Sequence, residues 1–452
     1  MMELLKIEEF AQTKAGGTPS TTVSEYWKNG NIPWLNSGAL NQGVVKSTSK
    51  FITKLGLEES STKLMPPDTI LIALTGATTG VIGYLTFEAC ANQSVVGILP
   101  SKRHFPKYLY YYLNLIRQKV LKDASGTAQP GINQKYVKNI QIPIPPLDEQ
   151  KHIVAKLDSC FEAIDKAHAN VEKNLNNAKE LFKSNLQLAI GGEITKEWRK
   201  NNPHIEHSNK TIERIISVRN RLVKNKKLKY SKLIKNSKSF KHESRLPKNW
   251  CWVKANEILF VTKLAGFEYT KHINLQSEGE IPVIRAQNVR PIHIVKNNLL
   301  FIDKKTSELL HRCALTKKCL LVTFIGAGIG DVATFNEYER WHLAPNVAKM
   351  ELFDGCDKLI SLEFLNFFLL SNRGKKEIFK HMKATAQPSL SMATIRDFDL
   401  PIPPIEEQNL IVKQLQRLTT QTQSLESNYQ QELDALDELK NTILQKAFNG
   451  EL

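Results

Sequence analysis

The pattern of apolar and polar positions divides the chain into two globular stretches and two long segments with helical periodicity. Residues 147–190 and 405–449 contain neither glycine nor proline. Within each segment, apolar residues recur at alternating spacings of four and three, starting from Ile153 and from Ile411. Each segment therefore predicts one long helix, and a helix of 44 residues spans roughly 65 Å. We expect the two helices to pack as an antiparallel coiled coil, because a single helix would leave its apolar stripe in water.

The two predicted seams follow the same spacing over the full length of both segments. The first contains Ile153, Leu157, Cys160, Ile164, Ala167, Val171, Asn174, Ala178, Leu181, Asn185 and Leu188. The second contains Ile411, Leu415, Leu418, Thr422, Leu425, Tyr429, Glu432, Leu436, Leu439, Ile443 and Lys446. We interpret Asn174 and Asn185 as buried polar residues that fix the register. The alternative is that the seam frays there or is shared with a partner.

Both long segments follow a stiff proline-rich run, and the two runs are copies of each other. Pro143-Ile144-Pro145-Pro146-Leu147-Asp148-Glu149-Gln150 is repeated 258 residues later as Pro401-Ile402-Pro403-Pro404-Ile405-Glu406-Glu407-Gln408. The same offset relates Thr127-Ala128-Gln129-Pro130 to Thr385-Ala386-Gln387-Pro388, and Gly192-Glu193 to Gly450-Glu451. A constant offset over this distance predicts a twofold internal repeat with helices of matched length.

The remaining stretches read as two α+β domains with twisted sheets, each followed by one of the long helices. Residues 1–146 form the first domain, with strands expected near 32–35, 69–75, 81–87, 95–99 and 140–144 and a helix at 105–122. Residues 246–404 form the second, in which 281–284, 326–330 and 364–378 repeat landmarks of the first. Residues 147–190 and 405–452 are the long helical parts. Residues 191–245 are a basic linker, helical around 212–222.

Charge and cysteine usage narrow the environment and the partners. The net charge is +17, but residues 195–248 alone carry 17 basic and 4 acidic side chains, so much of the excess is local. Nucleic acid is the first partner this balance suggests. The chain has no run of 18 apolar residues and no signal peptide, and its six cysteines are scattered, so we expect a cytoplasmic protein without disulfides. The spacing of His311, Cys313 and Cys319 matches no standard zinc site.

One glycine run invites an enzymatic interpretation. Phe324-Ile325-Gly326-Ala327-Gly328-Ile329-Gly330-Asp331 resembles a loop that binds a nucleotide or S-adenosylmethionine. Such a loop must open a helix, whereas Val332-Ala333-Thr334-Phe335 follows here, which favours a turn between two strands. The sequence contains no GxxxxGK[ST] phosphate loop and no catalytic motif of amino-methyltransferases. We therefore expect a non-enzymatic chain. The alternatives are a self-sufficient methyltransferase and a coiled-coil adaptor without DNA specificity.

The duplicated PIPP-x-[DE]EQ runs, the two TAQP loops and the trailing GGE and NGE resemble those of a specificity subunit of type I restriction–modification systems. The resemblance covers the whole chain, although the first half lacks the Leu-Pro-x-x-Trp lead of residues 246–250. It implies two target-recognition domains that each read one half of a bipartite DNA site. It also implies that the helices dock two modification (methyltransferase) subunits, which restriction (translocase–nuclease) subunits then join. S-adenosylmethionine, ATP and Mg are expected on those partners, and no cofactor on this chain.

Polar side chains on loops are the natural candidates for contacting DNA, since amide and guanidinium groups read base edges and basic groups bind phosphates. Glycines would let the backbone approach closely. The candidates are Thr18, Ser20, Asn36, Ser37, Asn41, Thr75, Thr78, Thr79, Ser125, Thr127, Gln129, Arg285, Gln287, Asn288, Arg290, Gly326, Gly328, Thr385, Gln387 and Ser389. Glu149, Gln150, Glu407 and Gln408, at the starts of the long helices, are the candidates for binding partner subunits.

Overall fold

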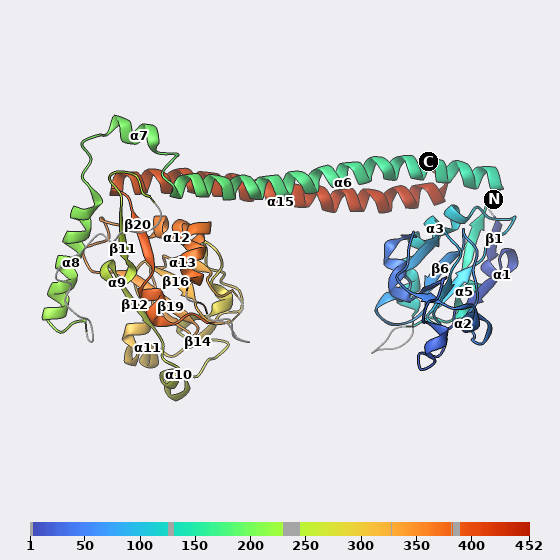
Figure 1. The fold of residues 1–452 in the computed structure, drawn as a ribbon, viewed down its shortest axis with the longest axis horizontal. Coiled ribbons are helices and arrows are strands. Elements are labelled where there is room, and N and C mark those ends of the chain that lie inside the picture. Colours follow the sequence, from blue (N-terminus) through green and yellow to red (C-terminus); the bar gives the residue numbers. More distant parts are fainter. Residues whose placement is uncertain (1–2, 125–130, 229–244, 327, 381, 383–388) are drawn as a thin grey trace. The chain divides into compact units, whose positions relative to one another are not determined.

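A computed structural model describes residues 3–124, 131–228, 245–326, 328–380, 382 and 389–452 (Figure 1). The chain forms two compact units. Unit 1 comprises residues 1–174 and 428–452, and unit 2 comprises residues 175–427. The two long helices are α6 (Leu147–Ile190) and α15 (Ile405–Asn449), and each contributes one part to each unit. Their bounds confirm the predicted ranges. No helix among the described residues is long and apolar enough to cross a membrane.

Unit 1 is built from three small sheets. Their strand orders are β2-β9-β6-β7-β4, β5-β3-β8 and β1-β10. The strands are β1 (Glu3–Lys6), β2 (Thr13–Ala15), β3 (Ile32–Leu35), β4 (Val44–Val45), β5 (Phe51–Ile52), β6 (Ile70–Ala73), β7 (Ile82–Leu85), β8 (Cys90–Ala91), β9 (Val95–Ile98) and β10 (Gln141–Ile144). The shorter helices are α1 (Ile7–Phe10), α2 (Lys54–Glu58), α3 (Pro106–Leu115), α4 (Arg117–Asp123) and α5 (Gln134–Asn139). The helix expected at 105–122 is thus two helices, because the backbone leaves helical geometry at Ile116.

Unit 2 repeats this plan. Its strand orders are β12-β19-β16-β17, β14-β13-β18-β15 and β11-β20. The strands are β11 (Cys251–Lys254), β12 (Leu259–Lys263), β13 (Ile281–Ile284), β14 (Leu300–Ile302), β15 (Ala314–Leu315), β16 (Cys319–Thr323), β17 (Val332–Phe335), β18 (Trp341–Leu343), β19 (Val347–Leu352) and β20 (Asp399–Ile402). The shorter helices are α7 (Lys196–Asn201), α8 (Ser208–Lys224), α9 (Ala255–Ile258), α10 (Gly266–His272), α11 (Lys304–Leu309), α12 (Leu362–Leu370), α13 (Asn372–Phe379) and α14 (Met392–Arg396).

The predicted internal repeat is confirmed by strand pairing. In unit 1, β1 pairs antiparallel with β10, with Glu3 opposite Ile144, and in unit 2 β11 pairs with β20, with Cys251 opposite Ile402. In both units an equivalent pair is parallel, β3 with β8 and β13 with β18, and unit 1 has a second parallel pair, β4 with β7. The strand that leads into each long helix therefore lies beside the first strand of its own unit. This pairing anchors the proline-rich run.

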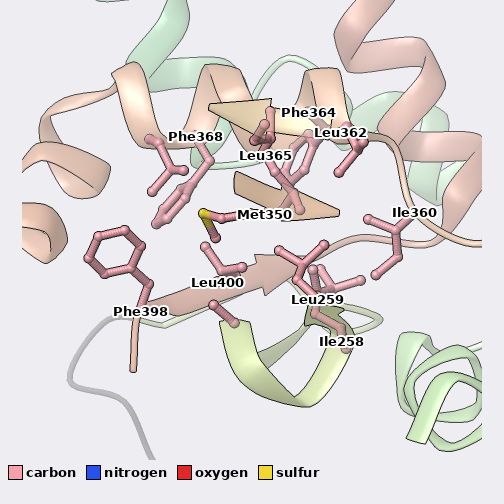
Figure 2. Close-up of a cluster of buried hydrophobic side chains, with 14 of the residues drawn as sticks. Ile258, Leu259, Met350, Ile360, Leu362, Phe364, Leu365, Phe368, Phe398 and Leu400 are labelled. Carbon is pink, nitrogen blue, oxygen red and sulfur yellow. The ribbon is translucent and has the colours of Figure 1, made fainter. Parts of the chain in front are cut away.

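Each unit has its own apolar core, which includes part of the helix pair. In unit 2, Leu362, Phe364 and Phe368 of α12 face Met350 of β19 and Leu400 of β20 (Figure 2). In unit 1 the core joins α3 and β10 to side chains of both long helices: Leu157, Phe161 and Ile164 of α6 and Leu444, Ala447 and Phe448 of α15. Burial of such side chains contributes about 1.5–3 kcal/mol each. The long helices are therefore integral to both cores.

The helix pair runs antiparallel, as predicted, and its seam follows the predicted one in the first half of α6 but departs from it in the second half. In unit 1, Lys440 Nζ lies 2.9 Å from Asp165 Oδ1, so a late residue of α15 meets an early residue of α6. In unit 2 late residues of α6 and early residues of α15 line one cavity of about 420 Å³. A stripe of buried or half-buried positions runs along α6 through Ile153, Leu157, Phe161, Ile164, His168, Val171, Leu175, Ala178, Phe182, Leu186 and Ala189, and the predicted seam positions Cys160, Ala167 and Asn185 beside it are half-buried. The positions of α15 that correspond to this stripe, 258 residues later, are also buried or half-buried.

These positions recur every 3.6 residues, the period of a straight α-helix, and not every 3.5. A seam that repeats every 3.5 residues turns gradually around a straight helix, so in the second half of α6 some of the predicted seam positions face solvent. Asn174 is exposed, and Leu181 and Leu188 are exposed too, so the prediction that Asn174 is a buried register residue is wrong. Asn185 is half-buried and donates its amide to the Leu181 carbonyl of its own helix, at 2.9 Å. Leu425 and Leu439 are exposed in the same way on α15.

The basic linker carries the predicted helix as α8, but its apolar face is not free in solvent. Ile212, Ile215 and Ile216 of α8 belong to the unit 2 core together with Trp250 and Trp252. α8 lies against α9 and β11 (Figure 1). The linker therefore covers one side of unit 2.

Candidate nucleic-acid interface

In unit 1, backbone hydrogen bonds draw four loops to one edge of the sheets. Gly16 N donates to Val95 O at 2.9 Å, and Asn92 N donates to Leu35 O at 2.9 Å. Leu74 N donates to Ser94 O at 2.8 Å. The loops that follow β2, β3, β6 and β8 consequently meet. The loop that precedes α5 joins them, since Ile132 N donates to Leu74 O at 2.8 Å.

The side chains at this edge are mostly small and polar, and several bond to one another across loops. Thr18 Oγ1 donates to the side-chain oxygen of Gln93, and Thr75 Oγ1 donates to Ser94 Oγ at 3.0 Å. Asn36 Oδ1 accepts from Ala39 N at 3.1 Å, which caps a short 3₁₀ turn, and leaves the Asn36 amide nitrogen at the surface. Ser37 and Asn41 lie within that turn. The structure thus brings the predicted Thr18, Asn36 and Thr75 to one edge.

The close approach of the loops depends on glycine. A Cβ atom on Gly16 would lie 2.1 Å from Asn92 O, and one on Gly17 would lie 2.6 Å from Thr62 N. Both separations are far below van der Waals contact, so only glycine fits. The turn after β2 therefore determines where Thr18 and Ser20 are presented.

Three residues at this edge were missed in the sequence. Asn92, Gln93 and Ser94 connect β8 to β9, and Asn92 Oδ1 is buried without a hydrogen-bond partner among the described residues. The available signal was a short polar run between two apolar strands. Next to this edge lies a groove of about 800 Å³ whose walls include Thr18, Trp27, Trp34 and Lys50. The two tryptophan rings pack edge to face at 5.1 Å.

Unit 2 has an edge of the same construction. Ala344 N donates to Ile284 O at 2.9 Å, and Phe324 N donates to Asn346 O at 3.0 Å. Leu390 N donates to Phe324 O at 2.9 Å, and Ser389 forms a bridge with Ile325. Three of the four bonds of unit 1 have counterparts here, those that Asn92, Leu74 and Ile132 donate. Different side chains occupy the equivalent places, for example Arg285 where unit 1 has Asn36.

The glycine run at 326–330 is a turn between two antiparallel strands, as predicted. Val322 of β16 is opposite Val332 of β17, and Gly330 N donates to Thr323 O at 2.8 Å. Gly326, Gly328 and Gly330 have φ between +82° and +94°, a conformation that favours glycine. The strand that follows leaves this turn without the helix N-terminus that a cofactor-binding glycine loop requires.

Three charged side chains surround this turn. Lys375 Nζ donates to Gly330 O at 2.6 Å and lies 3.9 Å from Asp331 Oδ1. Arg290 Nη1 donates to Val289 O at 2.9 Å. Burial raises the pKa of Asp331, although Lys375 and Arg290 oppose that shift, and burial lowers the pKa of Lys375. The cluster fixes the glycine turn beside Arg290.

The structure contradicts two of the predicted DNA contacts. Asn288 is fully buried; its amide nitrogen donates to Val295 O and Asn297 O, and its oxygen accepts from Arg285 N. Thr79 is 2% exposed and its hydroxyl donates to Gly76 O at 2.8 Å. Both side chains hold turns of their own unit through these hydrogen bonds. The sequence could not show this, because it gives the polarity of a side chain but not the direction in which it points. Arg285 is half-buried, with Nη2 donating to Asn298 O.

The other predicted positions divide into two groups. Ser20, Asn41 and Gln287 are exposed, and Ser37 and Thr78 are half-buried. Ser125, Thr127, Gln129, Thr385 and Gln387 lie outside the described residues.

The glutamine of each proline-rich run is buried and not a surface residue. Its side-chain hydrogen bonds form what we call the joint, which holds the first turn of the long helix to its unit. Gln150 donates to Pro145 O at 2.8 Å and Arg103 O at 3.1 Å, and accepts from Phe105 N at 2.7 Å. Gln408 repeats this, donating to Pro403 O and accepting from Ser361 N at 2.8 Å. The prediction that Gln150 and Gln408 bind partners is therefore wrong. Each ties the first turn of a long helix to the start of α3 or α12.

The neighbouring glutamates behave differently from each other. Glu407 is fully buried and accepts hydrogen bonds from side chains of its own unit, so its predicted role in partner binding is also wrong. Glu149 is exposed and remains a candidate.

Comparison with known proteins agrees with this architecture. Residues 1–177 and 247–435 match the family described as type I restriction modification DNA specificity domain. The chain is 26% identical over 444 residues to the type I restriction enzyme EcoKI specificity subunit of Escherichia coli strain K12, covering 94% of this chain and 84% of that protein. It is 24% identical to the MjaVIII specificity subunit of Methanocaldococcus jannaschii, covering 100% and 92%.

Two solved structures share the fold. One was described in a study of the structural basis of complex assembly and conformational transition of the type I restriction–modification system. It matches with a TM-score of 0.70 at 16% identity, over 100% of this chain and 98% of that one. The HsdS subunit from Thermoanaerobacter tengcongensis matches with a TM-score of 0.52 at 16% identity, over 100% and 97%. With its matched family domain, duplicated loop edge and paired long helices, the chain belongs to the family of type I restriction–modification DNA specificity subunits.

Proposed function

We propose that each unit reads one half of a bipartite site in double-stranded DNA. The observation that carries this proposal is the duplicated loop edge, in which three backbone hydrogen bonds recur in both units while the side chains differ. Asn36 corresponds to Arg285, and Ser94 corresponds to Asn346. Amide and guanidinium groups select different bases in the major groove. The same scaffold would then read two different half-sites.

The charge of the chain supports binding to DNA phosphates. The net charge is +17, and Lys28, Lys50, Arg290 and Lys375 lie at or beside the two loop edges. Contacts to phosphates supply affinity without sequence information, and they weaken as salt rises. We expect nonspecific binding to fall steeply with salt.

Catalysis in this proposal belongs to partner subunits. Two modification subunits would dock on the paired helices and methylate adenine, using S-adenosylmethionine that they bind themselves. Restriction subunits that use ATP and Mg would join this core and cleave. The duplicated joint at Gln150 and Gln408 supports two docking positions, because it sets α6 and α15 against their units in the same way.

The test is to map methylated adenines across a genome in cells that express the modification subunits with and without this chain. The proposal predicts one bipartite methylated motif that disappears without the chain. Methylation that persists unchanged in its absence would refute the proposal. A variant with Thr75→Ala and Ser94→Ala is expected to relax one half of the motif only.

A further inference from the structure

The loop that follows β3 in unit 1 and the loop that follows β13 in unit 2 have matching backbones. Gly43 is the eighth residue after the end of β3, and Ile292 is the eighth after the end of β13. Both have positive φ, +67° and +76°. Gly43 O accepts a hydrogen bond from β7, and Ile292 N donates one to β17, the corresponding strand. Counting back two residues places Asn41 in unit 1 where unit 2 has Arg290.

The Arg290 guanidinium is held at one end and open at the other. Nη1 donates to Ala286 O at 3.3 Å and to Val289 O at 2.9 Å. Within the described part of the chain, Nε and Nη2 take part in no hydrogen bond or ion pair. The N–H bonds of Nε and Nη2 lie on the same side of the planar group and form a fork of two parallel donors. Arg290 therefore presents a pair of donors whose orientation the backbone fixes.

The other arginine of this loop, Arg285, does not present such a fork. Its Nη2 donates to Asn298 O, and its Nε is buried and has no hydrogen-bond partner among the described residues. A buried Nε cannot reach a ligand together with Nη2. Arg290 is therefore the arginine of this loop that can offer two donors to one partner.

The glycine turn leaves space beside Arg290. A Cβ atom on Gly328 would lie 3.9 Å from Arg290 Nη1, so any larger side chain at this position would crowd the guanidinium. In unit 1 the equivalent turn has Thr78 in place of Gly328, and it lies against the 3₁₀ turn that contains Asn41. The long side chain is thus paired with a glycine and the short one with a threonine.

Asn41 presents an amide at this position of unit 1. It is exposed, and its side chain forms no hydrogen bond with the described residues. Gln42 beside it is occupied, because its Nε2 donates to Ser47 O at 3.2 Å and its Oε1 accepts from Lys46 N at 3.3 Å. The Asn41 amide offers one donor and one acceptor side by side.

We infer that Arg290 and Asn41 select one base each. Arg290 donates from Nε and Nη2 to O6 and N7 of a guanine in the half-site of unit 2. Asn41 bonds through its amide to N6 and N7 of an adenine in the half-site of unit 1. In the major groove a guanidinium fork matches the two acceptors of guanine, and an amide matches the donor and acceptor of adenine. The inference rests on the proposed function and deepens it, because it names a base for each unit.

The repeat favours a base over a phosphate as the partner of Arg290. A phosphate also accepts two hydrogen bonds from a guanidinium fork. A phosphate contact conserves positive charge, however, whereas the equivalent position of unit 1 has the uncharged Asn41. Two side chains with different donor and acceptor patterns on the same backbone are what reading two different bases requires.

The test exchanges each side chain for its counterpart and measures which DNA is bound. The full chain is assembled with its modification subunits, and the complex selects from duplexes in which each position of the wild-type motif is varied in turn. Arg290→Asn should replace one guanine of the selected motif by adenine, and Asn41→Arg should replace one adenine of the other half by guanine. The preference for the original base should fall by roughly tenfold or more, as expected for a lost bidentate contact. Each exchange should leave the opposite half unchanged, which also shows that the variant folds.

Two controls separate base reading from charge. Arg290→Lys keeps the charge and removes the fork, so it should relax the selection of guanine. Arg373→Asn removes the same charge from an exposed position of α13 and should leave every base preference unchanged. Guanine selection that survives Arg290→Lys or Arg290→Asn, or that is lost equally in Arg373→Asn, would overturn the inference. A wild-type complex that selects no bipartite motif would instead refute the proposed function itself.

Discussion

The two copies of the proline-rich run allow a matched comparison of how much Glu407 and Glu149 contribute to stability. Glu407→Ala removes the acceptor for three donors, Thr195, Arg199 and Trp250. Breaking a buried ion pair costs about 3–5 kcal/mol, and an unsatisfied buried donor costs about 1–3 kcal/mol. The Arg199 side chain is 18% exposed and keeps a hydrogen bond to Gly192 O at 2.7 Å, so we expect the lower end, about 3 kcal/mol. Glu149→Ala, at an exposed position, should change stability by less than about 0.5 kcal/mol.

The two variants can be compared by thermal unfolding and by amide hydrogen exchange. For a unit of this size, about 1 kcal/mol shifts Tm by roughly 2–4 °C, so Glu407→Ala should lower the Tm of the unit 2 transition by about 6–12 °C. Faster exchange should appear in α8 and β11 and not in β1, because the lost bonds hold the α7–α8 segment onto unit 2. Equal effects of the two substitutions, or loss of protection in β1, would refute this reasoning.

Three further predictions concern the joints, the loop edge and the helices. Gln150→Leu leaves the Phe105 N–H and the Pro145 carbonyl without their partner, and should destabilise unit 1 by about 2–3 kcal/mol in urea unfolding. An unchanged midpoint of unfolding would show that the Gln150 hydrogen bonds do not stabilise unit 1. Gly16→Ala puts a Cβ 2.1 Å from Asn92 O, and should lower stability by about 1–3 kcal/mol and weaken DNA binding through unit 1. Stability and DNA binding equal to those of the wild type would contradict the role of this loop edge. Inserting four residues after Asn176 lengthens α6 by about 6 Å and should lengthen the spacer of the methylated motif by one or two base pairs. An unchanged spacer in an active complex would show that helix length does not set it.

The long helices and the repeat could be read from the sequence because each rests on a local signal. Forty-four residues without glycine or proline leave α6 few alternatives to a helix, and a constant offset needs no structure to detect. The seam was misplaced in the second half of α6 because a heptad and a straight helix differ by only 0.1 residue per turn, which becomes one position after about ten turns. Leu181 and Leu188 therefore satisfied the pattern while lying in solvent.

The site residues were harder to predict, since burial depends on parts of the chain that are distant in sequence. Glu149 and Glu407 have the same local motif, and only the docking of Thr195, Arg199 and Trp250 distinguishes them. Asn288 is polar and follows a strand, as a residue that contacts DNA bases would, but its side-chain amide closes a loop of its own unit. Asn92, Gln93 and Ser94 were missed because their place at the edge follows from strand pairing, which no local pattern reveals.

The central claim, that the two units read DNA separately, is tested most directly by exchanging residues 246–400 for the second domain of another specificity subunit. The exchanged chain is assembled with its modification subunits, and methylated adenines are mapped genome-wide. Our account predicts that one half of the methylated motif takes the sequence read by the donor domain, while the other half and the spacer stay the same. A change in both halves together would contradict it.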